Sequence, residues 1–230
     1  MLFAYKRPMQ TILRQFIYNP PQDPYLDICY EDEDIVICIK PSGLLSVPGR
    51  GEDKQDCLAN RLREKYGEIF IVHRLDLETS GVIVFARNAE MQSALGKMFM
   101  ERRVEKDYIA DVYGELPGLC GVIELPLICD WPNRPRQIVD FNEGRPSTTK
   151  WTRLEQFENH ARVKLKPVTG RTHQLRVHMQ NLGHPMLGDS LYAPDEAFTN
   201  YSRLHLHAWR ISFAHPLSRI PIEIDTILFY

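Results

Sequence analysis

The chain has 230 residues, of which 43% are hydrophobic and 25% charged, and its formal net charge is −2. This balance is typical of a globular protein, and the length suffices for one large domain or two small ones. No apolar run approaches the ~18 residues of a membrane span. The five cysteines form no Cys-x-x-Cys pair, which favours reduced thiols in a cytoplasmic protein over a disulfide framework or a zinc cluster.

The small net charge argues against a nucleic-acid partner, but the charge is unevenly distributed. Residues 22–56 hold nine acids and three bases, whereas residues 145–176 hold eight bases and two acids. Such asymmetry can place one basic face on a nearly neutral protein. Ordinary solvated surfaces explain the same composition, so this observation alone does not select between the two interpretations.

The first half of the chain alternates between short strands and helices. Residues 1–20 are expected to form an arm, because the prolines at 20, 21 and 24 interrupt regular structure. Residues 21–230 are expected to form a single domain. The elements predicted in chain order are strands at 28–30 and 35–39, a helix at 56–66, strands at 69–72 and 82–86, a helix capped by Asn88, and a strand at 106–114.

The second half of the chain is richer in strands. Residues 116–136 form a long connection, and loops of this length inside a compact domain are usually functional. Strands at 151–154 and 162–166, a helix capped by Thr172, and strands at 204–207, 211–213 and 222–229 follow in the prediction. Because strands dominate without regular β-α-β alternation, the expected class is α+β, with a mixed, mostly antiparallel sheet flanked by helices and loops.

One polar loop is expected between two buried strands. Apolar runs at 69–72 and 82–86 flank His73, Arg74, Asp76 and Glu78, and Thr79-Ser80-Gly81 closes the loop as a turn. A rigid scaffold that holds a polar loop is where chemistry is usually placed. An isolated Arg-x-Asp pair would more often only complete a turn.

Several weaker signals have simpler structural interpretations. His205 and His207 share one face of a strand, but no acid or cysteine completes a ligand set, so no metal is predicted. Gly170-Arg171-Thr172 at a helix start is a weak phosphate-binding signal. Tyr108 and Trp131 lie near basic residues and suit base stacking, although single aromatic residues are more often part of a core.

Five segments, taken together and in this order, resemble the RluA-type pseudouridine synthases. They are Lys40-Pro41-Ser42-Gly43-Leu44, His73-Arg74-Leu75-Asp76, Lys106-Asp107-Tyr108, residues 170–178 and residues 183–189. The loop at 126–135 is most similar to that of the dual-specificity members, which modify both tRNA and large-subunit rRNA. The chain has no room for the small RNA-binding domain that some relatives carry in front, and its arm is also consistent with a start at Met9.

The resemblance implies a pseudouridine synthase fold with a central catalytic cleft. It implies an isomerase that converts specific uridines to pseudouridine in structured RNA, namely large-subunit rRNA and a tRNA anticodon stem-loop. By resemblance, Asp76 is the catalytic carboxylate, Arg176 forms an ion pair with it, and Tyr108 stacks on the uracil. The reaction needs no redox cofactor or metal, so no cofactor is predicted. Three roles stay open for Asp76: attack on the sugar, attack on the base, or removal of a sugar proton.

The resemblance also implies that the target base is flipped out of its stack and that Arg74 fills the vacated place. The predicted RNA-binding residues are Arg74, His73, Arg134, Arg136, Lys166, Arg171 and His173. RNA is the expected partner, with no membrane and no obligate protein partner. Two alternatives remain: an inactive RNA-binding or RNA-chaperone protein, which has no need of Asp76, and a glycoside hydrolase with Glu78 as its second acid.

Overall fold

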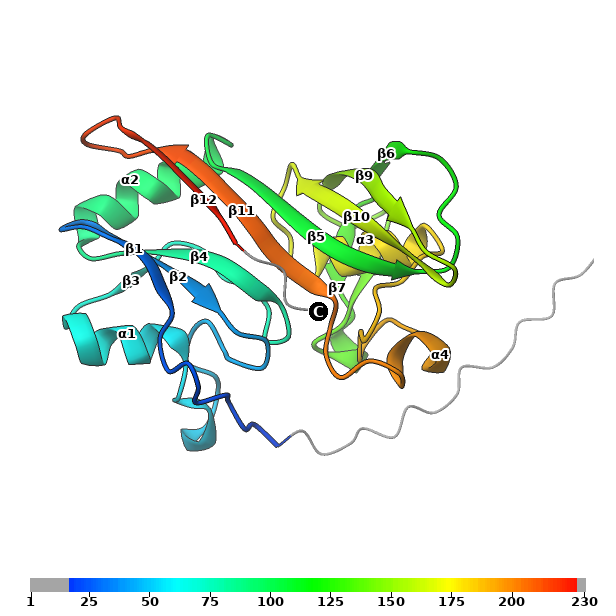
Figure 1. Ribbon diagram of the computed structural model, residues 1–230, viewed down its shortest axis with the longest axis horizontal. Helices are drawn as coiled ribbons and strands as arrows, with labels where there is room; N and C mark the ends of the chain where they lie inside the picture. Colours follow the sequence, from blue (N-terminus) through cyan, green and yellow to red (C-terminus); the bar gives the residue numbers. More distant parts are fainter. Residues whose placement is uncertain (1–16, 227–230) are drawn as a thin grey trace, which may run out of the picture.

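A computed structural model describes residues 17–226, and one mixed sheet dominates them (Figure 1). The main strand order is β1-β2-β4-β11-β5-β10-β9-β6, with β3 paired to β4 and β12 paired to β11. Within the described residues, β4 and β11 run parallel and the other paired strands of this sheet are antiparallel. The predicted α+β class with a mostly antiparallel sheet is therefore confirmed.

The strands of this sheet vary from two to nine residues in length. They are β1 (Ile28–Glu31), β2 (Ile35–Lys40), β3 (Phe70–Ile71), β4 (Ser80–Ala86), β5 (Glu105–Tyr113), β6 (Cys120–Glu124), β9 (Thr148–Gln156), β10 (His160–Pro167), β11 (Leu206–Ala214) and β12 (Pro221–Asp225). A separate hairpin pairs β7 (Leu127–Cys129) with β8 (Gln137–Val139). The helices are α1 (Leu58–Tyr66), α2 (Ala89–Met100), α3 (Gln174–Asn181) and α4 (Asp195–Phe198), with short 3-10 turns at Glu52–Lys54 and Trp131–Asn133.

The sheet joins two hydrophobic cores. Figure 1 shows the long strands β5 and β11 running from the half of the molecule that carries α1 and α2 to the half that carries α3. Leu62 of α1 and Leu95 of α2 belong to the first core, and Leu175 and Met179 of α3 belong to the second. Tyr108 of β5 packs against both cores, so it lies at their junction.

Glycine allows the two halves to meet closely where β4 pairs with β11. Gly81 has φ 111°, and a Cβ atom added to it would lie 2.2 Å from the carbonyl oxygen of Ala208. Only glycine fits this backbone conformation and this spacing. The parallel pairing of β4 with β11 begins at Ser80 and Gly81, directly after the polar loop that precedes β4, and so fixes the end of that loop in the sheet.

Local predictions had mixed outcomes. The Asn88 cap of α2 is confirmed, since its side chain accepts a hydrogen bond from the backbone N–H of Met91 at 2.8 Å. The Thr172 cap is wrong, because α3 begins at Gln174 and His173 occupies the cap position with φ 51°. The connection at 116–136 contains β6 and β7, and β11 is one continuous strand where two were predicted.

Two further expectations concern the ends of the chain and membrane spans. The expected arm at residues 1–20 lies outside the described residues apart from residues 17–20. Across residues 17–226, the helices are all too short or too polar to cross a membrane.

Candidate active site

The polar loop between β3 and β4 is held by hydrogen bonds to residues 42–46, the segment that follows β2. Ser46 donates its hydroxyl to the carbonyl oxygen of Leu75 at 2.8 Å and accepts the Leu75 N–H at 3.1 Å. The N–H of Gly43 donates to the carbonyl oxygen of Leu77 at 2.9 Å, and the hydroxyl of Ser42 donates to that of Glu78 at 2.7 Å. The backbone on both sides of Asp76 is thus fixed by hydrogen bonds.

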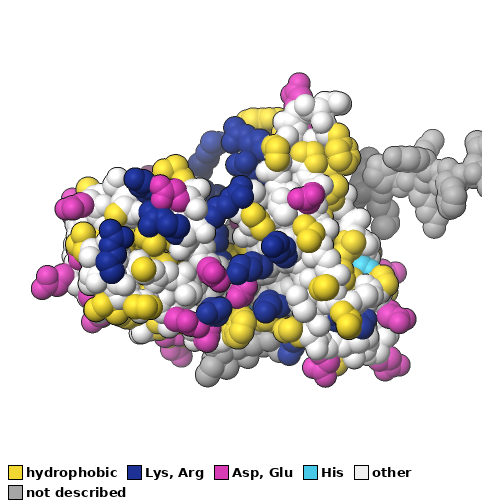
Figure 2. All heavy atoms as spheres, turned by 90° about the horizontal axis from the view of Figure 1, so that it is seen from above, with side chains coloured by type: hydrophobic (Ala, Val, Ile, Leu, Met, Phe, Trp, Pro, Cys, Tyr) yellow, Lys and Arg dark blue, Asp and Glu magenta, His cyan; other side chains and the backbone are white. Residues whose placement is uncertain are grey.

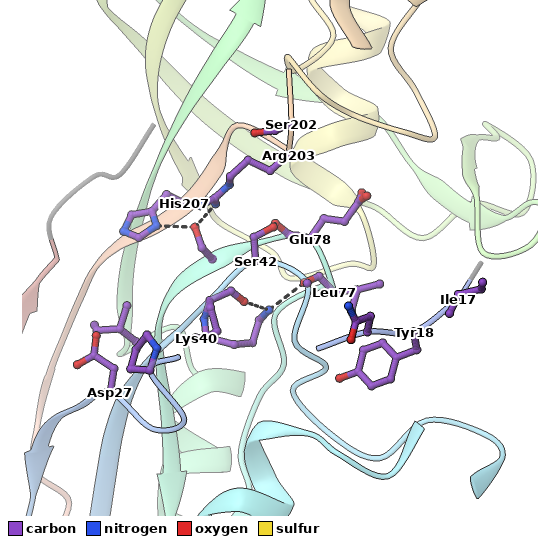
Figure 3. A pocket seen from close by; sticks show the side chains of 16 residues that line it. Ile17, Tyr18, Asp27, Lys40, Ser42, Leu77, Glu78, Ser202, Arg203 and His207 are labelled. Atoms are coloured by element: carbon purple, nitrogen blue, oxygen red, sulfur yellow. Dashed lines mark hydrogen bonds between the residues drawn. The ribbon is translucent and has the colours of Figure 1, made fainter. Parts of the chain in front are cut away.

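Lys40 is the central element of this support, and Figure 3 shows its side chain reaching toward Leu77. Its buried ammonium group donates to the carbonyl oxygens of Pro41, Leu44 and Leu77 at 2.9, 2.6 and 3.0 Å. Burial lowers the pKa of Lys40 to about 7, while the charge of Asp76 acts in the opposite direction. A pocket of about 630 Å³ lies on this side of the loop.

A larger cleft of about 790 Å³ lies on the other side of the loop and is strongly basic. Seven of its lining residues are cationic, against the two acids Asp76 and Glu105. The cations are Arg74, Arg102, Lys106, Lys150, Lys166, Arg171 and Arg176. Figure 2 shows Lys and Arg side chains gathered along the hollow between the two halves of the molecule. Such a cleft suits a polyanion and concentrates it near Asp76.

Asp76 lies in the cleft wall with about a quarter of its side chain exposed. Two nitrogen donors face its Oδ2 atom: Nε2 of His173 at 3.9 Å and Nη1 of Arg176 at 4.0 Å. Both separations exceed hydrogen-bond length. The predicted ion pair between Arg176 and Asp76 is therefore present only as a long contact.

The shortest contacts of Arg176 are made with Asp189, which the sequence analysis did not place in the site. Nε and Nη2 of Arg176 donate to the two carboxylate oxygens of Asp189 at 2.7 and 2.6 Å. Both side chains are almost completely buried. The hydrogen bonds with Asp189 and the charges of Asp189 and Asp76 raise the pKa of Arg176 despite its burial, so this group stays cationic.

Tyr108 lines the cleft from β5. Its pKa is raised by burial and, secondarily, by the charge of Asp76. The phenol is therefore neutral at physiological pH and can donate a hydrogen bond. Tyr108, Asp76 and Arg176 all line the one cleft, so the structure brings the three predicted catalytic residues together.

Glu78 does not join Asp76 in the cleft. It lines the pocket on the Lys40 side, where its carboxylate accepts a hydrogen bond from Ser190 at 3.0 Å and lies 3.5 Å from Nη2 of Arg176. Burial raises the pKa of Glu78. A glycoside hydrolase needs two acids facing one bond, and this arrangement turns the candidate second acid away from the cleft.

The predicted RNA-binding residues divide into two groups. Arg74, His73, Lys166, Arg171 and His173 line the cleft. Arg134 and Arg136 do not: their guanidinium groups lie over the rings of Trp131 and Tyr192, at 4.6 and 5.4 Å from the ring centroids. Their predicted role in binding RNA therefore stays a prediction, for a surface outside this cleft.

His73 lines the cleft as a neutral side chain. Burial, together with the charge of Lys106, lowers its pKa to about 3. Its Nε2 atom accepts the N–H of Val84 at 3.1 Å, and its ring packs on Phe99. These contacts hold the start of the loop against β4. Because its pKa is lowered, His73 carries no positive charge with which to bind a phosphate.

Three cations of the cleft were not among the RNA-binding residues named individually from the sequence: Arg102, Lys106 and Lys150. Lys150 belonged to the basic stretch at 145–176, so its charge was visible, but its direction on β9 was not. Arg102 lies just after the end of α2, with φ 59°, and Lys106 is the second residue of β5. The switch from helix to strand is what brings these two residues to the cleft.

The histidines considered as metal ligands are engaged elsewhere. His205 contacts Asp111 at 3.1 Å, and His207 contacts the hydroxyls of Ser80 and Thr226, each at 2.7 Å. Burial lowers the pKa of His207 to about 4. The His205-x-His207 pair therefore serves to join β11 to neighbouring segments.

Comparison with known proteins gives a consistent family likeness. The profile described as RNA pseudouridylate synthase matches residues 34–181. A protein of Vibrio cholerae named dual-specificity RNA pseudouridine synthase RluA is 52% identical over 201 residues, covering 87% of this chain and 82% of that protein. The protein of the same name from Escherichia coli K12 is 50% identical over 200 residues, covering 86% and 91%.

Solved structures agree with this likeness. The human protein named RNA pseudouridylate synthase domain containing 1 superposes with a TM-score of 0.73 at 28% identity, covering 94% of this chain and 86% of that one. Human RNA pseudouridylate synthase domain containing 4 has a TM-score of 0.70 at 24% identity and shares the fold.

Proposed function

The chain belongs to the RNA pseudouridylate synthase family, and from this premise we propose how its cleft converts uridine in RNA to pseudouridine. The enzyme is an isomerase acting on RNA. The observation that supports our assignment of its residues is that the basic cleft holds Asp76 between Tyr108 on β5 and Arg176 on α3.

The reaction rearranges bonds within one nucleotide. The bond from ribose C1′ to uracil N1 breaks, a bond from C1′ to C5 forms, C5 loses its proton, and N1 gains one. Asp76 is the carboxylate that acts on the reacting nucleotide, which requires its ionised form. Its cationic neighbour Arg176 supports that form by charge, at 4.0 Å.

Tyr108 and Arg74 act on the position of the uracil base. The phenol ring of Tyr108 offers a face for stacking and a hydroxyl near the base. Arg74 is exposed, lines the cleft and lies two residues before Asp76. A target uridine must leave its stack to reach Asp76, and Arg74 occupies the vacated position. A guanidinium does not release its proton in proteins, so Arg74 takes no part in proton transfer.

Lys150, Lys166 and Arg171 hold phosphates along the rim of the cleft. Lys166 pairs with Glu105 at 2.9 Å in the free protein, and this exposed pair is weak enough for a phosphate to displace Glu105. The hairpin that carries Trp131, Arg134 and Arg136 offers further contacts beyond the cleft.

The RNA targets are large-subunit rRNA and a tRNA anticodon stem-loop, and the enzyme works in the cytoplasm without a cofactor. The proposal follows the relatives named dual-specificity synthases, of which this chain covers more than four fifths. Mapping pseudouridine in total RNA from cells with and without the gene tests it. Loss of sites in both RNA classes is expected; loss in one class alone refutes dual specificity.

An inactive RNA-binding protein on the same fold is not favoured. A binding protein has no use for a carboxylate among seven cations, because that charge repels the phosphates of RNA. The same RNA mapping separates the two functions, since an inactive protein leaves every pseudouridine in place when its gene is removed.

A further inference from the structure

The turn that follows α3, residues 187–192, contacts three residues near Asp76: Arg176, Glu78 and His173. Asp189 binds Arg176, Ser190 binds Glu78, and Tyr192 contacts His173 at 2.8 Å. None of the three turn residues lines the cleft. They therefore form a layer behind the residues that face the substrate.

This turn is rigidly anchored. Gly188 has φ 68°, and a Cβ atom added to it would lie 1.8 Å from the carbonyl oxygen of Arg203, so only glycine fits. The N–H of Leu187 donates to the carbonyl oxygen of Asp111 on β5 at 2.9 Å. The turn is thereby fixed to the strand that also carries Tyr108.

Asp189 determines the direction of the Arg176 guanidinium. One carboxylate oxygen accepts from Nε and the other from Nη2, which is the planar, two-bond geometry that fixes an arginine most firmly. Oδ1 of Asp189 also accepts the backbone N–H groups of Leu191 and Tyr192 at 2.9 and 3.1 Å. With its guanidinium plane fixed in this way, Arg176 has Nη1 directed at Asp76.

Tyr192 determines the tautomer of His173. The N–H of Gln137 donates to the Tyr192 oxygen at 2.7 Å, and we assign the hydroxyl proton to the hydrogen bond with Nδ1 of His173, at 2.8 Å. A neutral imidazole that accepts at Nδ1 carries its proton at Nε2. Burial lowers the pKa of His173, which keeps the ring neutral. Its Nε2–H then faces Oδ2 of Asp76.

We propose that Asp189 and Tyr192 are positioning residues that aim the N–H groups of Arg176 and His173 at the same carboxylate oxygen of Asp76. The inference rests on the proposed role of Asp76 and deepens it. At 3.9 and 4.0 Å the two donors are too far for direct hydrogen bonds in the free enzyme. They are within reach of Oδ2 through a small movement of the loop when RNA binds.

The backbone of His173 gives independent support. It has φ 51°, a left-handed conformation that is uncommon for residues other than glycine, although histidine, like asparagine and aspartate, adopts it more often than most. Such conformations cluster at functional sites, where the surrounding structure imposes them. Here the hydrogen bond from Tyr192 and the start of α3 hold His173 in a place that puts its ring beside Asp76.

The test uses single-turnover kinetics on a stem-loop transcript containing a uridine identified by the RNA mapping. Asp189→Asn keeps the shape and the backbone contacts of Oδ1 but presents an amide to Nε of Arg176. Misplacing a catalytic group by about 1 Å can cost 100-fold, so a rate loss of about 10- to 100-fold is expected, with RNA affinity unchanged. Tyr192→Phe removes only the hydroxyl and should slow the reaction about tenfold.

Double-mutant cycles separate positioning from general damage. If Asp189 acts through Arg176, Asp189→Asn adds little further loss in the Arg176→Lys background. If Tyr192 acts through His173, Tyr192→Phe adds little in the His173→Asn background, where asparagine tolerates the left-handed backbone. Losses that multiply in both cycles overturn the proposal.

Asp111→Asn is the matched control, because Asp111 also forms a buried two-bond pair, with Arg162 at 2.8 and 2.9 Å, outside the cleft. Asp111→Asn should lower the stability of the protein without lowering the single-turnover rate on bound RNA. If Asp189→Asn does not fold, the Tyr192 cycle decides the result alone. Should Asp76→Asn retain the wild-type rate, the proposed function fails; should Asp76→Asn be inactive while Asp189→Asn and Tyr192→Phe match wild type, only the positioning inference fails.

Discussion

Lys40 supports the polar loop that carries Asp76, and replacing it with methionine should change how the stability of the protein depends on pH. The side chain is buried and donates to three carbonyl oxygens, one of which belongs to Leu77 beside Asp76. Burial lowers the pKa of Lys40 from 10.5 to about 7 in the folded protein. Lys40→Met keeps a long side chain and removes both the charge and its titration.

The direction of the pH effect follows from proton binding. Between pH 7 and pH 10.5 the unfolded chain holds a proton on Lys40 that the folded chain has released. Stability therefore rises with pH in this window, by about 1.4 kcal/mol per pH unit. Below pH 7 both states are protonated and the effect disappears. From pH 7.5 to pH 9, wild type should gain about 2 kcal/mol relative to Lys40→Met.

Urea unfolding of the two proteins at pH 7.5 and pH 9 measures this gain, because contributions from other groups cancel in the difference. A difference in unfolding free energy that stays constant with pH would show that the three carbonyl oxygens hold Lys40 at its ordinary pKa. The account of a proton released by burial would then be wrong.

Three further substitutions test separate parts of the site. Arg176→Lys keeps the charge but loses the planar pair with Asp189, so the single-turnover rate should fall by about 10- to 100-fold while RNA binding is retained. Arg74→Ala should lower the reaction rate on a folded stem-loop far more than the rate on an RNA whose target uridine is already unstacked. Equal losses of rate on both RNAs, with a salt dependence of binding that is shallower by about one unit of slope, would indicate that Arg74 anchors a phosphate instead. Gly81→Ala places a Cβ atom against the Ala208 carbonyl and should lower the free energy of unfolding by about 3 kcal/mol or more, and a melting temperature near that of wild type would refute the close approach.

Local sequence predicted those elements whose signals are local. The Asn88 cap lies where a hydrogen bond to a residue three positions further on requires it. The start of α3 was misplaced because the contact that holds His173 comes from Tyr192, 19 residues further on. A cap predicted from Thr172 alone contains no information on that contact.

The site was predicted only in part, because some of its contacts join residues that are distant in the sequence. The resemblance led to Asp76, Tyr108 and Arg176, and these residues do meet in one cleft. Asp189 lies in the matching segment 183–189, but the resemblance assigned it no role, because the partner of a buried arginine depends on the packing of a turn against β5. Arg134 and Arg136 were predicted to bind RNA, but the sequence did not reveal that their guanidinium groups lie over the rings of Trp131 and Tyr192, away from the cleft.

The single-turnover rate of Asp76→Asn shows whether the carboxylate of Asp76 is required for the isomerisation of uridine. The substitution keeps the shape of the side chain and removes its charge, and loop contacts made by the neighbouring backbone remain. RNA from cells lacking the gene, incubated with an excess of enzyme, supplies the substrate. The account predicts pseudouridine formation at background level with RNA binding intact. A rate within about tenfold of wild type, which is only ~1.4 kcal/mol in the barrier, would contradict it.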